Sequence, residues 1–194
     1  QPNVGKSTLL NALIGQERTI VSDIAGTTRD TIHTHYNLFN KEFMLIDTAG
    51  IRRKAKVHED LEFYSVIRAI KAVDESDICM LMLDAGKGIT AQDLSIFSLA
   101  VKKGKGIVVL VNKWDALEKD TNTMEAYTNI VRRELNFMDY VPLLFISALT
   151  GQRVDQVLPL ALQVQEERLR RLTTSKINQL LQKAKDQHAP PSKA

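Results

Sequence analysis

Short apolar runs alternate along the chain with longer segments that have helical periodicity. The apolar or alternating runs predict strands at about 32–39, 42–47, 77–84, 107–112 and 142–146. Apolar residues three or four positions apart predict helices at about 5–14, 59–73, 91–103, 123–135 and 153–171. Asn40-Lys41 is typical of a tight hairpin turn, which would pair the first two strands antiparallel. The alternation favours an α/β fold in which helices cover both faces of a mostly parallel sheet.

The C-terminal part of the chain has a different pattern. Thr173-Thr174-Ser175 could cap a further helix that runs through about His188, and Ala189-Pro190-Pro191 would end it. We therefore divide the chain into a domain over residues 1–171 and a tail over residues 172–194.

The composition is that of an ordinary globular protein, with 44% apolar and 25% charged residues among 194. No run approaches the roughly 18 apolar residues that span a bilayer, and no signal peptide is visible, so we expect no membrane partner. A single cysteine, Cys79, excludes an intramolecular disulfide and a cysteine metal cluster. It lies in an apolar run, which predicts a buried structural thiol. A cytoplasmic protein fits these features.

The net charge of +3 is mildly basic, and two local clusters carry much of the positive charge. Their members are Arg52, Arg53, Lys54 and Lys56, and then Lys102, Lys103 and Lys105. Such clusters are either a solvated surface or a contact with phosphate backbones, for which RNA is the expected partner.

The most informative motif is Asn112-Lys113-Trp114-Asp115, of the form Asn-Lys-x-Asp. The carboxylate of Asp115 can accept hydrogen bonds from N1 and N2 of guanine, and adenine has neither donor there. A buried acceptor left unpaired by the wrong base costs about 1–3 kcal/mol. The motif follows the predicted strand 107–112, and nucleotide sites lie at the carboxyl ends of such strands.

The phosphate end of the same site is carried by the first residues. Gln1-Pro2-Asn3-Val4-Gly5-Lys6-Ser7 matches all but the first glycine of the loop G-x-x-x-x-G-K-[ST]. Backbone N–H groups of this loop and of the following helix would face the phosphates. Lys6 would reach the β- and γ-phosphates, and the Ser7 hydroxyl would ligate Mg²⁺.

The chain begins inside this motif. We expect the opening glycine and the strand before it, which belongs near the middle of the sheet, to lie upstream of Gln1. The interpretation is therefore a P-loop NTPase fold whose first strand is missing from the sequence.

Three further segments fit the same site. Asp47-Thr48-Ala49-Gly50 ends a predicted strand, where the carboxylate would hold Mg²⁺ through a water and the Gly50 N–H would approach the γ-phosphate. A threonine of Gly26-Thr27-Thr28-Arg29-Asp30 would complete the metal shell. In Ser147-Ala148-Leu149, the Ala148 N–H would contact O6 of guanine. Each segment is weak evidence alone, but the ordered set is highly specific.

The motif order resembles the translation-factor-related GTPases of the Era, Der and tRNA-modification group. More narrowly, Asp47–Lys54 and Gly151-Gln152-Arg153-Val154 are similar to the second GTPase domain of the Der (EngA) family. The resemblance covers nearly the whole chain, and the tail resembles the first helix of that family's KH-like domain. It implies that the first GTPase domain, an acidic linker and the rest of the KH-like domain lie outside this sequence.

The resemblance also implies roles for individual residues. Thr28 becomes the expected Mg²⁺ ligand beside Ser7 and Asp47, and Asn3 matches a K⁺-binding asparagine, although it could simply stabilise the loop. Catalysis would rest on Lys6, Thr28 and Gly50. The nucleotide-binding residues would be Asn3, Val4, Gly5, Lys6, Ser7, Thr8, Asp47, Gly50, Asn112, Lys113, Asp115, Ser147, Ala148 and Leu149.

The expected function is a GTP-binding and GTP-hydrolysing switch that binds Mg²⁺. The resemblance adds K⁺ as a second ion, which would take the place of an arginine finger. Ile51 stands where many GTPases carry a water-orienting glutamine, and its aliphatic side chain cannot orient water. Hydrolysis should therefore be slow unaided. The family implies a role in assembly of the large ribosomal subunit and contact with ribosomal RNA. A tRNA-modification-type GTPase and a non-catalytic GTP-dependent interaction module remain as alternatives.

Overall fold

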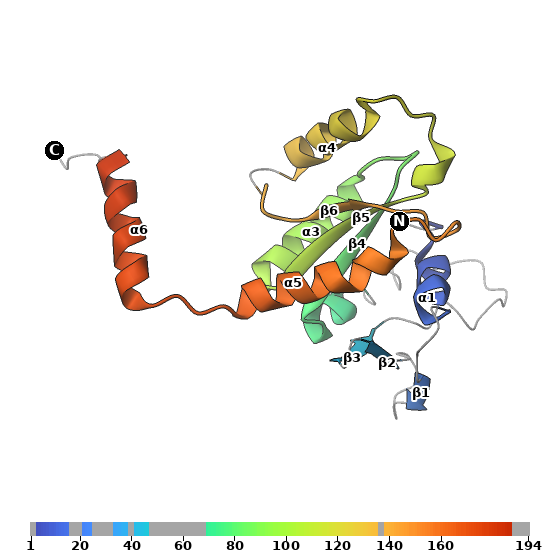
Figure 1. Cartoon of the computed structure of the whole chain (residues 1–194), viewed down its shortest axis with the longest axis horizontal. Helices are drawn as coiled ribbons and strands as arrows, with labels where there is room; N and C mark the ends of the chain where they lie inside the picture. The colour runs from blue at the N-terminus through green and yellow to red at the C-terminus, as the bar shows by residue number, and fades with distance from the viewer. Residues whose placement is uncertain are drawn as a thin grey trace.

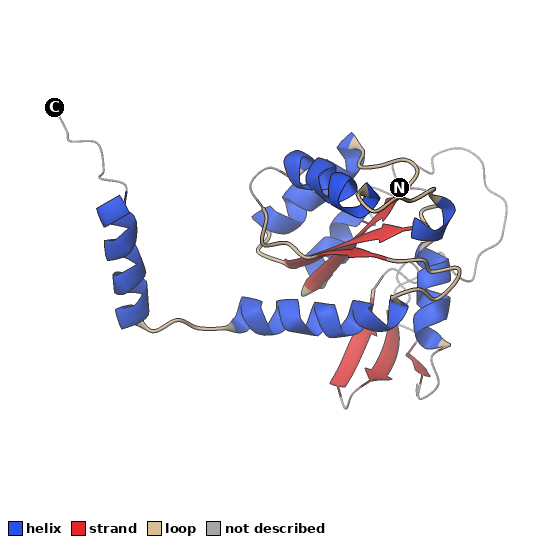
Figure 2. Cartoon of the chain, turned by 45° about the horizontal axis from the view of Figure 1, so that its top comes forward, coloured by secondary structure: helices blue, strands red, loops and turns tan. Residues whose placement is uncertain are grey.

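The computed structural model describes residues 3–15, 21–24, 33–38, 41–46, 69–135 and 138–187, with backbone only for 21–24, 33–38 and 41. Within these ranges the strands form two sheets of three strands each (Figures 1 and 2). One sheet is parallel and the other is antiparallel. The α/β class with a parallel sheet is confirmed, while the expected strand ahead of the phosphate loop stays a prediction.

The parallel sheet has the order β4-β5-β6. Its strands are β4 (Ile78–Asp84), β5 (Gly106–Asn112) and β6 (Leu143–Phe145). Every residue of β5 is buried, as its continuous apolar run predicts for a central strand covered on both faces. The register places Asp84 opposite Asn112, so the last residues of β4 and β5 lie side by side at one edge.

One face of this sheet is covered by α3 (Ala91–Lys102) and α4 (Thr123–Glu134). Their buried side chains include Phe97 and Val131, and they pack in one cluster with alternate residues of β5. The α3 helix begins at a capping box, in which Thr90 and Asp93 exchange side-chain and backbone hydrogen bonds.

The opposite face is covered by α1 (Lys6–Ile14) and α5 (Val157–Leu169). Leu9 and Leu13 of α1 and Leu158 of α5 pack against the other alternate residues of β5, including Val108 and Leu110. Helices therefore lie on both faces of the sheet, as the sequence predicts, and the period of two along β5 divides the core into two clusters.

The antiparallel sheet consists of β1 (Val21–Ile24), β2 (His33–Leu38) and β3 (Lys41–Leu45). The pairing of β2 with β3 confirms the predicted hairpin. Lys41, which was expected in the turn, instead lies in β3 opposite Leu38. The strand β1 is not predicted from the sequence, because Val-Ser-Asp-Ile has neither an apolar run nor strict alternation.

The predicted boundaries agree with the structure to within a few residues where both exist. Of the helix expected at 59–73, the structure describes 69–75 as helical, and the remainder lies outside the described residues. The helix expected at 153–171 is a 3-10 turn, η3 (Val154–Gln156), followed by α5.

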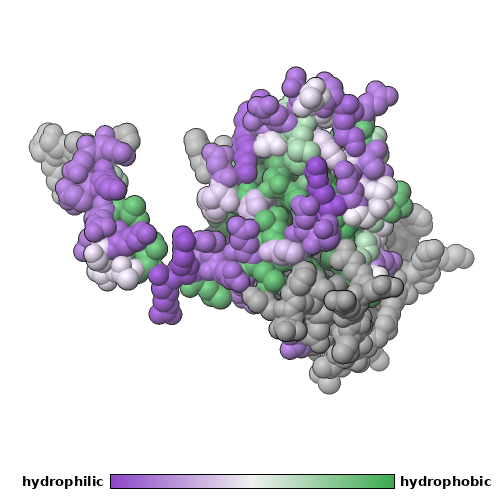
Figure 3. Space-filling model, viewed as in Figure 1, coloured by the Kyte–Doolittle hydropathy of each residue, from purple (hydrophilic) through white to green (hydrophobic). Residues whose placement is uncertain are grey.

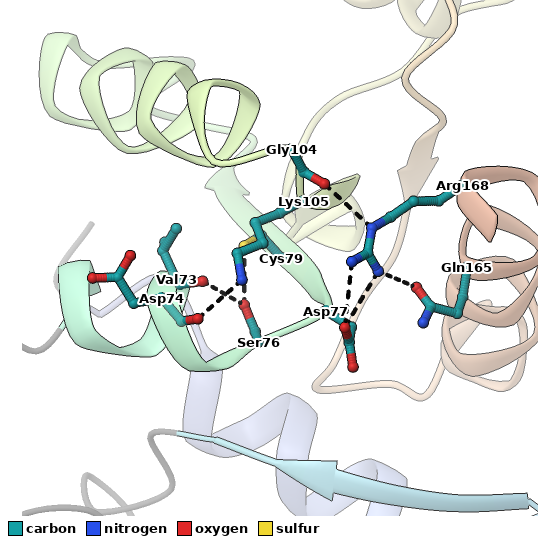
Figure 4. A network of polar contacts seen from close by, with 9 residues as sticks. All are labelled: Val73, Asp74, Ser76, Asp77, Cys79, Gly104, Lys105, Gln165 and Arg168. Carbon is teal, nitrogen blue, oxygen red and sulfur yellow. Dashed lines mark hydrogen bonds and ion pairs between the residues drawn. The ribbon is translucent and has the colours of Figure 1, made fainter.

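The C-terminal end of α5 is tied to the amino edge of the parallel sheet by Arg168 (Figure 4). Its guanidinium donates to the Gly104 carbonyl at 3.2 Å, to Gln165 at 2.8 Å and to the carboxylate of Asp77 at 3.3 Å. Asp77 immediately precedes β4, so this contact fixes where α5 ends relative to the sheet.

Beyond α5, the helix α6 (Thr174–Gln187) projects away from both sheets (Figure 1). All its residues are exposed, including Ile177, Leu180 and Leu181, which form an apolar stripe visible in green (Figure 3). The predicted tail helix is thus confirmed. Among the described residues, no helix is both long and apolar enough to cross a membrane.

Candidate functional site

The loop before α1 has the backbone conformation that phosphate binding needs. Asn3 and Gly5 both have positive φ, at 59° and 97°. A Cβ on Gly5 would collide with the side-chain nitrogen of Asn112, so only glycine fits this position. The first backbone bond of the helix runs from the Leu9 N–H to the Gly5 carbonyl at 2.9 Å.

The N-terminus of α1 supplies the donors of an anion site. Gly5 offers no side chain to cap the helix. The N–H groups of the first turn, at Lys6, Ser7 and Thr8, carry the positive end of the helix dipole, which favours an anion. Lys6 and Thr8 are exposed and Ser7 is half-buried. An ammonium, a hydroxyl and backbone donors at one helix end are the groups that hold a phosphate chain and its Mg²⁺.

Asn112 joins the phosphate loop to the loop after β6. Its side-chain nitrogen donates to the carbonyl of Val4 at 2.7 Å, and its side-chain oxygen accepts from the N–H of Ala148 at 2.9 Å. The residue is only 2% exposed. Since Val4 and Ala148 are also buried, this one amide holds together two loops that are far apart in sequence.

The next residue, Lys113, turns the chain at the carboxyl end of β5 with a φ of 62°. Its ammonium lies 2.6 Å from the carboxylate of Asp84, which is the last residue of β4 and is 5% exposed. Burial alone would raise the pKa of Asp84. The hydrogen bond from Lys113, the N–H of Gly86 and the charges of Lys113 and Lys87 outweigh burial and hold that pKa below its usual value.

Trp114 anchors the short 3-10 helix η2 (Trp114–Ala116). Its ring is 3% exposed and packs against Phe145 and Tyr127, with centroid separations of 4.4 and 5.7 Å. The backbone N–H of Trp114 donates to the Ile146 carbonyl at 3.1 Å. Trp114 therefore packs beside the motif and is not available to stack on a base. Asp115 follows it and is exposed.

The loop after β6 closes on itself around Ser147. The N–H of Ser147 donates to the Gln152 carbonyl at 3.1 Å, and its hydroxyl accepts from the N–H of Thr150 at 3.1 Å. Ser147 and Ala148 are buried, whereas Leu149 is 80% exposed. The N–H of Ala148, which the sequence assigns to guanine O6, is 2.9 Å from the side-chain oxygen of Asn112. Any contact with the base would therefore have to share this donor.

The structure brings three predicted segments together at the carboxyl edge of the parallel sheet. They are Asn3–Thr8, Asn112–Asp115 and Ser147–Leu149, linked through Asn112. Thr28, Asp47, Gly50 and Ile51 lie outside the described residues. Of the expected Mg²⁺ ligands, Ser7 alone therefore lies in the described part of the chain. No group of three or more His, Cys, Asp or Glu residues is placed there to hold a metal.

The basic cluster at the end of α3 is partly neutralised within the fold. Lys103 lies 2.9 Å from the carboxylate of Asp74, and Lys105 donates to the carbonyl of the same residue at 2.9 Å. The Lys105 contact belongs to the group of polar residues in Figure 4. These contacts favour a structural role for Lys103 and Lys105. The cluster from Arg52 to Lys56 lies outside the described residues.

Cys79 belongs to the same region and behaves as a structural thiol. It is half-buried, where full burial was expected, and its sulfur lies 3.3 Å from the Ser76 hydroxyl. Burial raises the pKa of the thiol, although the hydrogen bond with Ser76 and the charge of Lys105 act in the opposite direction. The neutral thiol is the less reactive form.

Asp84 is the residue of this site that the sequence analysis missed. The sequence pattern places Asp84 only at the end of the predicted strand 77–84, although it is an acid directly after an apolar run, at the same edge as the other motifs. That signal was available in the sequence. Its pairing with Lys113 depends on β4 and β5 being neighbours in register, which the sequence does not state.

Comparison with known proteins shows the family of the chain. Residues 1–113 match the family described as 50S ribosome-binding GTPase. The chain is 54% identical over 192 residues to GTPase Der of Flavobacterium psychrophilum and 52% identical to GTPase Der of Thermoanaerobacter pseudethanolicus. Each alignment covers 99% of this chain, and the chain spans about 44% of the length of these relatives.

Solved structures show the same fold. The chain superposes with a TM-score of 0.60 on Era in complex with MgGDPNP and nucleotides 1506–1542 of 16S ribosomal RNA, at 29% identity, covering 84% of this chain and 54% of Era. It also superposes on elongation factor SelB of Methanococcus maripaludis with a TM-score of 0.59. SelB is 20% identical, and the match covers 89% of this chain and 33% of SelB, which supports the fold alone.

Proposed function

This chain belongs to the family of 50S ribosome-binding GTPases, and from that premise we propose that it is the guanine-nucleotide switch of a protein that assembles the large ribosomal subunit. The observation that carries the nucleotide assignment is the double hydrogen bond of Asn112. These two bonds join the phosphate loop, at Val4, to the loop after β6, at Ala148. Asn112 is also the first residue of the Asn-Lys-x-Asp motif that ends in Asp115.

The base would be recognised by Asp115, which is exposed next to the buried anchor Trp114. A carboxylate accepts from both N1 and N2 of guanine, and it meets no such pair of donors on adenine. Because Trp114 is held by its ring and by its N–H, the carboxylate starts from a fixed backbone. Preorganisation of this kind raises affinity by lowering the entropy lost on binding.

The phosphates would be held by the N-terminus of α1, with Lys6 reaching the β- and γ-phosphates. Ser7, Thr28 and Asp47 are the residues we propose to hold Mg²⁺, which when bound neutralises the phosphate charge that develops during hydrolysis. The Gly50 N–H would contact the γ-phosphate. Ile51 cannot orient a water, so we expect slow unaided hydrolysis.

We further propose that Asn3 contributes to a K⁺ site near the phosphates. Its positive φ places it within the loop itself rather than in the helix. GTP turnover measured in K⁺ should exceed turnover in Na⁺ at equal ionic strength, and Asn3→Ala should remove the difference. Equal rates in the two salts would leave Asn3 with a purely structural role.

The partners we propose are ribosomal RNA and the large subunit, in the cytoplasm. The family description supports the ribosomal assignment, and the related Era protein has been solved with a segment of 16S ribosomal RNA. The exposed apolar stripe of α6 supports the expectation that residues 172–194 begin a further domain of KH-like type. We propose in the same way that a first GTPase domain, as in the Der family, belongs to the full-length protein.

Co-sedimentation tests the ribosomal part of the proposal. The purified protein is mixed with large ribosomal subunits in the presence of either a non-hydrolysable GTP analogue or GDP. We expect the protein to pellet with the subunits when the analogue is present and to remain in the supernatant when GDP is present. Absence from the pellet in both states would remove the ribosomal role and leave the nucleotide site unaffected.

Two alternatives predict other results. A tRNA-modification-type GTPase shares the early motifs, but the two curated relatives described above are both Der proteins. A non-catalytic module is suggested by the missing glutamine. Phosphate release from GTP is measured under single-turnover conditions. A rate no faster than the hydrolysis of GTP in buffer without protein would favour this module over a hydrolase.

A further inference from the structure

The carboxyl edge of β4 contributes a charged group to the proposed guanine site that none of its motifs includes. Asp84 ends β4 opposite Asn112, and the N–H of Ala85 donates to the Asn112 carbonyl at 2.9 Å. The backbone around Asp84 is thereby fixed against the start of the Asn-Lys-x-Asp motif. Its carboxylate is directed at the next residue of that motif, Lys113.

The contact between Asp84 and Lys113 has unusual geometry for a salt bridge at a protein surface. The side chain of Asp84 is 7% exposed and that of Lys113 is 41% exposed, with 2.6 Å between oxygen and nitrogen. The other carboxylate oxygen accepts from the N–H of Gly86 at 3.0 Å. A buried carboxylate that is fixed by a backbone donor holds the flexible lysine in one place, whereas most exposed pairs leave both partners mobile.

Lys113 needs such a restraint because its backbone is in the left-handed region. That conformation costs a non-glycine residue energy, and it persists only where the surroundings enforce it. Two neighbours of Lys113 are already held, since Asn112 binds two loops and Trp114 is buried. The ion pair restrains the residue between them, and so it completes the fixation of the turn that leads into Asp115.

We propose that Asp84 is a positioning residue for guanine recognition, which acts by holding Lys113 and with it the turn that presents Asp115. The proposal rests on the guanine site of the proposed function. It assigns no contact between Asp84 and the nucleotide. Its effect should therefore be largest for the hydrogen bonds that Asp115 makes to the base, and small for the phosphates.

Two nucleotides separate positioning of Asp115 from a general loss of structure. Inosine diphosphate lacks the 2-amino group of GDP, so it can make only one of the two hydrogen bonds to the carboxylate. A hydrogen bond to a charged group is worth about 1.5–3 kcal/mol, which predicts at least about tenfold preference of the wild-type protein for GDP over inosine diphosphate. Asp84→Asn should weaken GDP binding by about tenfold and reduce this preference to about threefold or less.

Asp77→Asn is the matched control. Asp77 immediately precedes the same strand, and its carboxylate also forms an ion pair, with Arg168 at 3.3 Å, far from the proposed site (Figure 4). This variant should bind GDP and inosine diphosphate as the wild-type protein does. A double-mutant cycle adds a second test. If Asp84 acts through Lys113, then Asp84→Asn combined with Lys113→Met should weaken GDP binding no more than Lys113→Met alone.

Affinities are measured by displacement of a fluorescent GDP analogue from the purified protein, and the thermal transition of each variant is recorded. If Asp84→Asn does not unfold cooperatively, Asp84→Ser replaces it in the same cycle. Wild-type binding with an unchanged preference for GDP in the Asp84 variant, or additive losses in the cycle, would overturn the positioning role alone. A wild-type protein that binds neither nucleotide would instead overturn the proposed function.

Discussion

Removal of the Asn112 side chain should destabilise the fold and the site together. In Asn112→Ala, the carbonyl of Val4 loses its 2.7 Å donor, and the N–H of Ala148 loses its 2.9 Å acceptor. Both residues are at least 96% buried, so water does not replace either partner without rearrangement. A buried polar group without a partner costs about 1–3 kcal/mol. The two groups together predict a loss of about 2–6 kcal/mol in the free energy of unfolding.

Urea denaturation measures this loss, because Trp114 is the sole tryptophan and is 3% exposed in the folded chain. Its fluorescence should report the transition directly. The same variant should release a fluorescent GDP analogue faster, because the phosphate loop is no longer joined to the loop after β6. Asn129→Ala is a suitable control, since Asn129 is exposed on α4 and its replacement should change stability by less than about 0.5 kcal/mol.

A loss of less than about 1 kcal/mol in the free energy of unfolding of Asn112→Ala, with an unchanged dependence on urea, would contradict this expectation. That result would mean that the two backbone groups find other partners at little cost. Unchanged release of the GDP analogue would contradict the second part of the argument, in which one amide couples the two loops.

Four further perturbations test other parts of the structure. Gly5→Ala forces a side chain into a φ of 97° and against Asn112, so it should weaken GDP binding by more than about tenfold; unchanged affinity would contradict the loop geometry. Thr90→Ala removes the cap of α3 and should lower the free energy of unfolding by about 1–2 kcal/mol, seen as a lower urea midpoint. Tyr127→Phe should be neutral or stabilising, because the buried hydroxyl has no partner among the described residues; a loss above about 1 kcal/mol would reveal one. The pKa of Asp84 is lower in the folded chain than its ordinary value. The stability that the ionised Asp84 contributes is therefore present above the ordinary carboxyl pKa range, and it is lost as the pH falls through the folded-state pKa. Asp84→Asn should accordingly flatten the decline in the free energy of unfolding below about pH 4.

Much of the fold follows from local patterns in the sequence. The strand β5 is a continuous apolar run and is buried throughout, and helical spacing predicts α3 and α4 to within one residue at each end. These elements need only their own residues to be recognised. The strand β1 was missed because its residues do not alternate, and it exists through backbone pairing with β2. Pairing of that kind depends on a partner, and no local pattern contains it.

The site divides in the same way. The motifs around Gly5 and Asn112 are recognisable because their chemistry fixes residue types at fixed spacing. The contacts between the motifs cannot be recognised in this way, because Asn112 contacts Val4 across 108 positions of sequence and Asp84 contacts Lys113 across 29. Such contacts depend on strand order and register. The sequence could therefore predict which residues belong to the site, but not that Asn112 joins two loops or that Asp84 holds the lysine.

The central claim is that the chain selects guanine nucleotides, and competition for a bound fluorescent GDP analogue tests it most directly. GDP and ADP carry the same phosphates, so they differ only in the groups that face Asp115 and the loop after β6. We predict that GDP displaces the analogue at equimolar concentration, and that ADP requires at least about a hundredfold excess, as expected when buried acceptors lose their donors. Displacement by ADP and GDP at similar concentrations would contradict the account.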